Sequence, residues 1–290
     1  MSDFVIITDS SCDLPASIVE ELGIHVVPLS FLMEDKSYYN YPDNRDMSPE
    51  EFYEKLQAGS MPTTNAVNIG QATEAMEEYL EQGKDVLVLG FDSALSTTYN
   101  SSRIAVEELS EKYPQRKLYT VDTLCASLGQ GLLVAHAAGK RAEGMDIEQV
   151  RDWVEANKLN LCHQFTVDDL FFLKRGGRVS AATAVVGTML AIKPVMHVDD
   201  EGHLVKVGTA RGRAASIKAL ADQMEKTAID PAGQIVYICH GDCIDDANKL
   251  ADMVRERFGV KEVVIGYTGP VIGSHSGPGT LALFWLGTKR

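Results

Sequence analysis

Two common nucleotide-binding motifs are absent from the 290-residue sequence. The Gly-Lys pairs continue as GKD and GKR, so the chain has no G-x-x-x-x-G-K-[ST] phosphate loop. No G-x-G-x-x-G segment opens a helix after an expected strand either. We therefore do not expect an intrinsic ATP-dependent kinase of these types.

Positive charge is also scarce. The chain has 27 Lys and Arg residues against 41 Asp and Glu residues, and its formal net charge is −14. Such a charge repels nucleic acids and anionic membrane surfaces at long range. We expect neither to be a partner of the chain.

No segment has the features of a secretion signal or of a membrane span. The N-terminal MSDFVIITDSS has no basic region and a single short apolar run. The longest nearly apolar stretch, residues 181–192, is too short to cross a bilayer. We expect a soluble cytoplasmic protein with no stable membrane insertion.

Cysteine is infrequent, and its spacing indicates no disulfide framework. The five cysteines fit a reducing compartment. Only CHGDC, residues 239–243, has spacing like that of metal ligands, and no second cluster completes a site. Because Cys239 ends the apolar run QIVYI, we interpret it as a buried strand-end cysteine and expect no metal and no cofactor.

Short apolar runs alternate with helical patterns in the first half of the chain. The runs cover residues 4–9, 24–33, 85–91 and 117–122. Runs of this kind separated by helices are typical of parallel strands that are buried on both faces. We predict an α/β, doubly wound N-terminal domain over residues 1–160.

The second half has a different pattern. KPVMHV, the turn DDEG and HLVKVGTA predict an antiparallel hairpin, followed by a helix from about Arg213. An acidic helix then lies between two further strands, QIVYICH and KEVVIGYTG. We predict a mixed α+β domain over residues 161–290.

Hydroxyl side chains cluster where several strands are expected to end. The segments are TDSSCDLP, PTTNA, DSALSTTYNSS and VDTLCAS. Each single cluster is explained by helix capping. Ligands of open parallel sheets bind at the carboxyl ends of strands, and four clusters together favour one polar crevice there.

Two enzymatic or binding alternatives remain open at this point. Ser93 or Ser276 could pair with His275 as in a serine esterase, but GSHSG places histidine where the G-x-S-x-G motif requires serine. The crevice could also bind a smaller polar ligand.

Apolar segments near the hydroxyl clusters supply enough surface to enclose an aliphatic chain. They are residues 170–173, 181–194 and 281–287, and core packing is the simpler explanation for each alone. A buried chain of about fourteen methylenes would contribute on the order of 10 kcal/mol before ordering costs.

Several motifs together resemble the DegV family. They are TDSSCDLP, PTT at residue 62, S-x-L-S-x-T-Y at 93, LFFLKRGGRVS at 170, KPV at 193 and HSGPGTLA at 275. The resemblance implies two α/β domains with a long-chain fatty acid between them. It also implies a lipid-binding subunit without catalytic residues, which presents the carboxylate to a separate ATP-binding kinase for acyl phosphate formation.

The resemblance also implies residue roles. Thr63, Thr64 and Ser93 would hold the carboxylate, His275 would complete the hydrogen-bond network, and the apolar segment after it would close the pocket. Arg175 and Arg211 would contact the kinase. For Arg213 we expect ordinary solvated surface charge.

The chain departs from the family pattern near the expected head group. The departures are Asn65 and Ala66 after Thr64, the Ser96-Thr97-Thr98 segment, Ser274 before His275, and Asp92 where serine is common. They bear on which ligand is bound and on coupling to a kinase.

Overall fold

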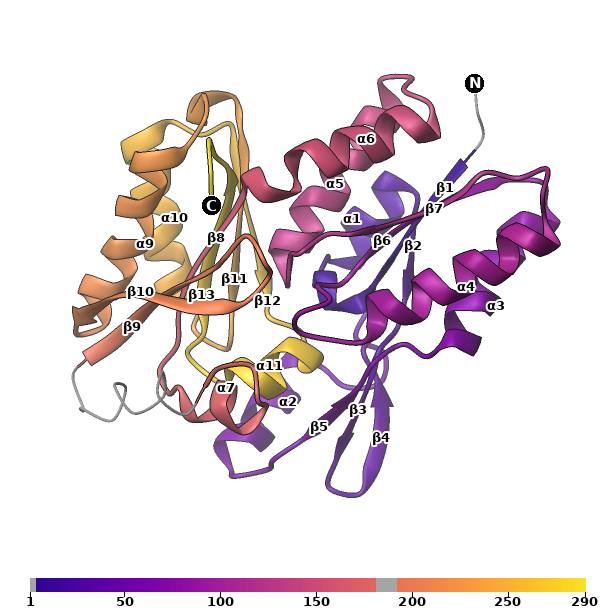
Figure 1. The fold of residues 1–290 in the computed structure, drawn as a ribbon. Coiled ribbons are helices and arrows are strands. Elements are labelled where there is room, and N and C mark those ends of the chain that lie inside the picture. The colour runs from indigo at the N-terminus through magenta and orange to yellow at the C-terminus, as the bar shows by residue number, and fades with distance from the viewer. Residues whose placement is uncertain (1–3, 181–191) are drawn as a thin grey trace.

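The computed structural model describes residues 4–180 and 192–290 of the chain. These residues form three β-sheets and the helices that pack on them. In Figure 1 a parallel sheet lies on the right, a larger mixed sheet lies on the left, and a small third sheet extends below the first. We call them sheet A, sheet C and sheet B, respectively.

Sheet A is a four-stranded parallel sheet in the first half of the chain. Its strands are β1 (Phe4–Asp9), β2 (Ile24–Val27), β6 (Asp85–Gly90) and β7 (Leu118–Asp122). Their order is β2-β1-β6-β7, and every neighbouring pair is parallel. The parallel α/β sheet predicted for this half is confirmed.

Helices cover both faces of sheet A, because successive side chains of a strand point to opposite faces. On one face, Val5 and Ile7 pack with α3 (Ile69–Glu81) and α4 (Thr98–Lys112). On the other face, Phe4 and Ile6 pack with α1 (Ala16–Leu22), α5 (Leu128–Ala142) and α6 (Ile147–Asn157). Burial on both faces explains why these strands are mainly apolar and do not alternate regularly between apolar and polar residues.

Sheet C is a six-stranded mixed sheet in the second half of the chain. Its strands are β8 (Leu161–Thr166), β9 (Ile192–Val198), β10 (Leu204–Arg211), β11 (Ile235–His240), β12 (Glu262–Tyr267) and β13 (Leu281–Leu286). Their order is β10-β9-β8-β13-β11-β12. Strands β11 and β12 are parallel, and the other neighbours are antiparallel. The predicted hairpin and the mixed fold class are confirmed.

Helix α5 lies between sheets A and C. Helices α9 (Arg213–Thr227) and α10 (Ile244–Phe258) cover the outer face of sheet C, on the left in Figure 1. The inner face joins one core with α5 and with sheet A, through residues such as Phe165 and Phe284. This double contact explains why α5 is buried almost all round.

Sheet B was not predicted from the sequence. It contains β3 (Ser30–Met33), β4 (Lys36–Tyr39) and β5 (Thr63–Asn65) in the antiparallel order β4-β3-β5. The apolar run at 24–33, expected to act as one element, is divided between sheets A and B at Pro28. Proline has no N–H to donate and a fixed φ, so it separates β2 from β3.

Short helices lie where sheets B and C meet. They are α2 (Pro49–Gln57), α7 (Phe171–Arg175) and α11 (Pro270–Ser276). Separately, 3-10 turns follow β1 at Ser10–Cys12, precede β8 at Lys158–Asn160 and precede β11 at Pro231–Gly233. Helix α11 contacts α7, β3 and β5 (Figure 1). Within residues 4–180 and 192–290, no helix has the length and apolar character needed to cross a membrane.

Candidate functional site

A cavity of about 540 Å³ lies between sheet A and sheet C. Loops that follow β6 and β7 form one side of it, through residues such as Ser93 and Ser127. Strands β8 and β13 supply the opposite side, through Phe165 and Phe284. The cavity is thus at the carboxyl ends of the parallel strands, where open α/β sheets bind ligands.

Three of the four hydroxyl clusters seen in the sequence contribute to this cavity. Residues from PTTNA, DSALSTT and the end of VDTLCAS line it. The expectation that all four line one crevice is wrong, because the first cluster faces elsewhere. Its Ser10, Cys12 and Asp13 line a separate cavity of about 440 Å³ beside β12.

Apolar side chains form much of the cavity wall. They come from both halves of the chain and include Phe91, Leu95, Phe165, Leu173, Ile272 and Phe284. Of the three apolar segments noted in the sequence, 170–173 contributes Leu173 and 281–287 contributes Phe284. The alternate residues Leu281, Leu283 and Trp285 of β13 instead pack into the core between sheet C and its outer helices. Residues 181–191 lie outside the described part of the chain.

Thr64 and His275 meet at one wall of the cavity. Thr64 lies in β5 opposite Phe31 of β3, and His275 lies in α11. The Thr64 Oγ1 and His275 Nε2 atoms are 2.8 Å apart and form a hydrogen bond. Both residues line the cavity. The contact between α11 and β5 therefore brings together two of the four residues that the resemblance implied.

His275 is held in its neutral form. Burial and, to a smaller extent, the nearby cations Arg178 and Arg175 together lower the pKa of its imidazole to about 4. Its other nitrogen, Nδ1, is buried without a hydrogen-bond partner among the described residues. That nitrogen lies against Gly176, where any Cβ would clash with it.

The imidazole proton belongs on Nε2, because a proton on Nδ1 would leave a buried N–H with no acceptor. Buried donors without partners are rarer and costlier than under-satisfied acceptors. With the proton on Nε2, His275 donates to Thr64 Oγ1. The Thr64 hydroxyl proton is then available to an oxygen atom inside the cavity.

Ser93 lines the same cavity, and Thr63 does not. Ser93 is exposed, and its backbone N–H donates to Asp122 Oδ1 at 3.2 Å. Thr63 is exposed on β5, opposite Leu32 of β3. Thr64, Ser93 and His275 are thus brought together around the cavity, whereas Thr63 lies apart.

The geometry gives no support to a serine-histidine pair. His275 Nε2 is bonded to Thr64, and Nδ1 faces Gly176, so neither nitrogen is engaged with a serine. Ser276 lines the cavity, and its buried Oγ has no partner in the described structure. A general base must lie within hydrogen-bond reach of its nucleophile, and His275 does not meet this condition.

Sequence reasoning missed the position of Arg178 in the cavity wall. Its guanidinium donates twice to the Leu95 carbonyl, at 2.8 and 3.1 Å, and also to the Gly176 carbonyl. Burial lowers the pKa of this guanidinium. It ties the segment after α7 to the loop that carries Ser93. The sequence KRGGR, residues 174–178, shows a cluster of basic residues, but it does not show that the Arg178 side chain points into the cavity wall.

Arg175 and Arg211 lie on different elements, and neither is among the residues that line the cavity. Arg175 ends α7, is half-buried, and donates from Nη2 to the Ser274 carbonyl at 2.8 Å. Arg211 ends β10 and is exposed. The Arg211 side chain is therefore open to solvent, whereas Arg175 holds the helix of His275.

A second set of polar side chains lines the deeper part of the cavity. Ser127 and Thr268 both donate to Cys239 Sγ, at 3.3 and 3.2 Å. Asp13 Oδ2 lies 2.5 Å from the same Ser127 hydroxyl, whose single proton is donated to either Asp13 or Cys239 at any one time. Burial raises the pKa of the Asp13 carboxyl to about 8. Cys239 is the last residue but one of β11 and is buried, as predicted. Ser127, Thr268 and Cys239 are hydrogen-bonded to one another, so an alkyl chain can lie over these three side chains.

The departures from the family pattern have different surroundings. The side chains of Asn65, Ala66, Ser96 and Thr97 line the cavity, and Thr98 bonds to Ser96 and to the Val67 N–H. Ser274 donates to the Pro270 carbonyl within α11, so it is occupied inside its own helix.

Asp92 lies behind the cavity-lining loop. It is fully buried and packs against Gly202 in the β9–β10 turn, and its Oδ2 has no partner among the described residues. Burial raises the pKa of its carboxyl to about 7, and the negative charge of Asp122 contributes. Asp92 of the first half of the chain thus packs directly against Gly202 of the second half.

No metal-binding cluster of three or more His, Cys, Asp or Glu residues occurs in residues 4–180 and 192–290. The five cysteines are free. The CHGDC segment is used for packing and hydrogen bonding, with Cys243 Sγ contacting the Thr280 carbonyl at 3.3 Å.

Comparison with known proteins identifies relatives over the whole length of the chain. A DegV domain-containing protein of Clostridium perfringens is 49% identical over 290 residues, which cover 100% of this chain and 99% of that protein. One from Streptococcus pyogenes is 37% identical over 284 residues, or 98% of each chain.

Solved structures share the fold. A DegV lipid-binding protein of Thermotoga maritima has a TM-score of 0.84 and 30% identity, with 100% of both chains covered. A DegV family protein of Thermus thermophilus described as binding fatty acid has a TM-score of 0.86 and 30% identity, with 97% and 98% covered. The family model described as "Uncharacterised protein, DegV family" matches residues 3–288. The chain therefore belongs to the DegV family.

Proposed function

We propose that the protein holds a long-chain fatty acid in the 540 Å³ cavity, with its carboxylate at Thr64, Ser93 and His275. The observation that carries this proposal is the Thr64–His275 hydrogen bond at the wall of a largely apolar cavity. Fatty-acid binding described for DegV proteins of Thermus thermophilus and Bacillus subtilis supports it. Thr63 is left out of the site because it is exposed and turned away.

The proposed head-group site can pay for removing a carboxylate from water. Burying such a group costs several kcal/mol unless hydrogen-bond donors satisfy its oxygen atoms. Thr64 can donate once His275 supplies the other hydrogen bond, and Ser93 lies on the same cavity. No ion pair with arginine is needed, so the carboxylate oxygen keeps its nucleophilic character.

We further propose that the bound carboxylate is presented to a separate ATP-binding kinase. One carboxylate oxygen would attack the γ-phosphorus of ATP held by the kinase, the bond to ADP would break, and an acyl phosphate would form. The chain itself has no phosphate loop, so the nucleotide must come with the partner. Arg175 and Arg211 would contact the acidic surface or the nucleotide of that partner.

The domain organisation and the cellular location are also proposals. We propose residues 1–160 and 161–290 as the two domains, with the ligand between them, and the cytoplasm as the place where the protein works. The kinase step requires ATP and would take place there.

The first experiment is denaturing extraction of the purified protein, followed by mass spectrometry of released lipids against a mock purification. We expect fatty acid in near-stoichiometric amount. A protein that is empty and that also fails to take up added fatty acids would overturn the proposal and favour a smaller polar ligand.

Matched variants locate the head group. Thr64→Val removes a cavity-lining hydroxyl, and Thr63→Val makes the same change one residue away on the exposed face. We expect Thr64→Val and Ser93→Ala to weaken fatty-acid binding by about 10-fold, which is typical for loss of a hydrogen bond to a charged group. Equal effects of Thr63→Val and Thr64→Val would contradict the site.

The kinase step has its own test. Arg211→Glu should reduce acyl phosphate formation with an ATP-dependent partner while lipid binding persists, and Arg255→Glu on the outer helix α10 is the control. Arg175→Glu should reduce acyl phosphate formation and also weaken lipid binding, because Arg175 holds the Ser274 carbonyl beside His275. Equal loss of lipid binding in Arg211→Glu would make Arg211 structural. Hydrolysis of a generic acyl ester without ATP would favour an esterase instead.

A further inference from the structure

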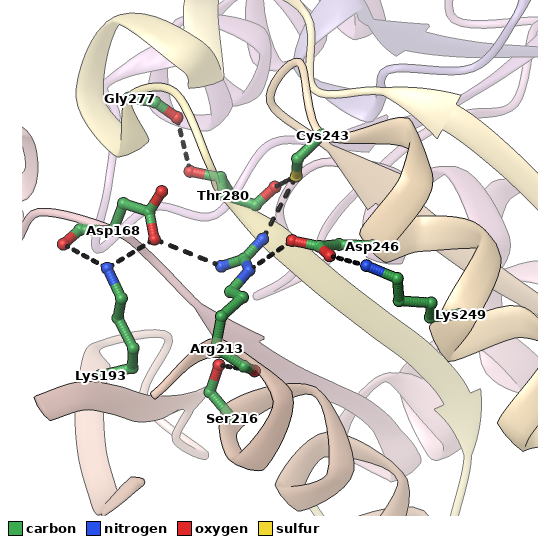
Figure 2. Close-up of polar contacts among 9 residues, drawn as sticks. All are labelled: Asp168, Lys193, Arg213, Ser216, Cys243, Asp246, Lys249, Gly277 and Thr280. Atoms are coloured by element: carbon green, nitrogen blue, oxygen red, sulfur yellow. Dashed lines mark hydrogen bonds and ion pairs between the residues drawn. The ribbon is translucent and has the colours of Figure 1, made fainter. Parts of the chain in front are cut away.

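Arg213 makes more contacts than a solvated surface charge would. Figure 2 shows its guanidinium between two acidic residues and a cysteine. Nε donates to Asp246 Oδ2 at 2.7 Å, Nη1 lies 3.6 Å from Asp168 Oδ1, and Nη2 lies 3.3 Å from Cys243 Sγ. The expectation of ordinary solvated charge is therefore wrong.

The position of Arg213 in its own helix is unfavourable for a cation. It is the first residue of α9, where the positive end of the helix dipole opposes positive charge. Asp168 and Asp246 compensate for this, and Lys193 and Lys249 bind the same two carboxylates at 2.7 and 3.0 Å. Contacts with residues outside α9 therefore stabilise Arg213 at this position, and its place at the start of α9 does not.

One side of this cluster reaches the turn that follows His275. Cys243 Sγ contacts the Thr280 carbonyl at 3.3 Å, and Thr280 Oγ1 donates to the Gly277 carbonyl at 2.7 Å (Figure 2). Thr280 lines the fatty-acid cavity. The hydrogen bonds therefore run from Arg213 to the end of α11, one residue beyond Ser276.

The other side of the cluster reaches the start of α7. Asp168 lies between β8 and α7, and its carboxylate packs against Gly279, where a Cβ would clash with it. Helix α7 ends at Arg175, which binds the Ser274 carbonyl, and Gly176 then packs against His275. Both segments that enclose the His275 ring are consequently attached to Arg213.

We propose that Arg213 is a positioning residue for carboxylate recognition. It fixes the position of the α7 segment relative to the 277–280 turn, and this arrangement keeps the His275 ring against Thr64. The inference rests on the proposed fatty-acid function, and it assigns to Arg213 selectivity for the head group and not for the chain.

The test compares Arg213→Met with Arg257→Met. Arg257 also joins α9 and α10, through Asp222 at 2.7 Å and Glu225 at 2.8 Å, and it is similarly exposed, at 25% against 21%. It touches neither α7 nor the turn through these pairs. Both variants therefore lose an ion pair between α9 and α10, but only Arg213→Met also loses the link to His275.

Affinities are measured for a fatty acid and for the fatty alcohol of the same chain length. We expect Arg213→Met to weaken acid binding by about 10-fold and alcohol binding by less than about 3-fold, because the head-group hydrogen bonds are affected. Arg257→Met should change neither, and Arg213→Lys should restore part of the selectivity. Equal weakening for acid and alcohol, or no weakening, would overturn the inference.

A ligand-independent measurement separates this inference from the proposed function. In ¹⁵N-labelled protein, the imidazole resonances of His275 should shift in Arg213→Met and stay unchanged in Arg257→Met. If Arg213→Met fails to fold, Asp168→Asn tests the α7 side of the cluster in the same way. Unchanged His275 resonances would contradict the positioning role of Arg213. A wild-type protein that binds no fatty acid would contradict only the proposed function.

Discussion

Thr64 and His275 are 211 positions apart in the chain, and a 2.8 Å hydrogen bond joins their side chains. One lies on a three-residue strand and the other on a seven-residue helix, and neither element would be stable alone. The hydrogen bond therefore reports on the packing of sheet B against α11. Four predictions test this packing and the cavity beside it.

Gly176→Ala should weaken fatty-acid binding. The new methyl group would clash with His275 Nδ1 and push the ring away from Thr64, although the backbone at 176 is in an ordinary helical conformation. We expect a loss of affinity of about 10-fold, measured by displacement of a fluorescent fatty acid. Gly139→Ala is the control, since nothing lies within 4 Å of its Cβ position in α5. Similar affinity in both variants would show that the ring is free to move.

His275 should stay neutral well below the pH at which an exposed histidine charges. Its pKa is lowered from 6.5 to about 4, so the unfolded chain binds the proton more tightly between these values. Its contribution to stability is present above pH 6.5 and is lost as the pH falls towards 4. Titration of the ¹⁵N imidazole resonances checks this, and a midpoint near 6.5 would contradict the described burial.

Asp92 should make stability depend on pH in the opposite direction. Burial raises its pKa from 3.8 to about 7, so its contribution is fully present below pH 3.8 and is lost as the pH rises through 7. Asp92→Asn cannot ionise. Its free energy of unfolding, relative to wild type, should therefore rise between pH 5 and pH 8 by on the order of 2 kcal/mol.

Urea unfolding of both proteins at several pH values measures this difference. The slope with pH is the quantity to compare, because the asparagine amide adds a constant cost of its own. Asp122 and Arg290 influence Asp92 from the N-terminal and C-terminal halves and are present in both proteins. A difference that does not change with pH would refute a raised pKa at Asp92.

Bound fatty acid should protect the Cys239 thiol. Burial raises the pKa of Cys239 to about 12 and of Cys162 to about 11, so both should react slowly with a small alkylating reagent. Cys239 lines the cavity, whereas Cys162 packs in the core of sheet C. Peptide mass spectrometry should show that added fatty acid slows labelling at Cys239 more than at Cys162. Equal slowing would indicate a general gain in stability.

The strands of sheet A were predictable because burial on both faces leaves a clear signal. Runs such as FVIITD and DVLVLG are mainly apolar, and their polar residues lie at the strand ends. Sheet B left no such signal. Its strands have three or four residues, and β4 is mostly exposed, so their pairing depends on contacts with α2 and α11.

Site residues that lie in a family motif could be predicted from the sequence, and the others were harder to predict. Thr64, Ser93 and His275 line the cavity, but the direction of adjacent residues depends on β5 pairing with β3, which separates Thr64 from Thr63. Arg213 was misjudged for a related reason. Its acidic partners are distant in sequence, and a lone arginine at the start of a helix gives no sign of them.

Strand β13 has a consequence for how the protein is made. It follows the other strands of sheet C along the chain, yet it pairs between β8 and β11, in the middle of the sheet. On the ribosome, β8 and β11 must wait with open edges until residues 281–286 emerge, and such long-range pairing is slow. Because Phe284 of β13 lines the cavity, the cavity wall is incomplete until residues 281–286 have emerged and paired.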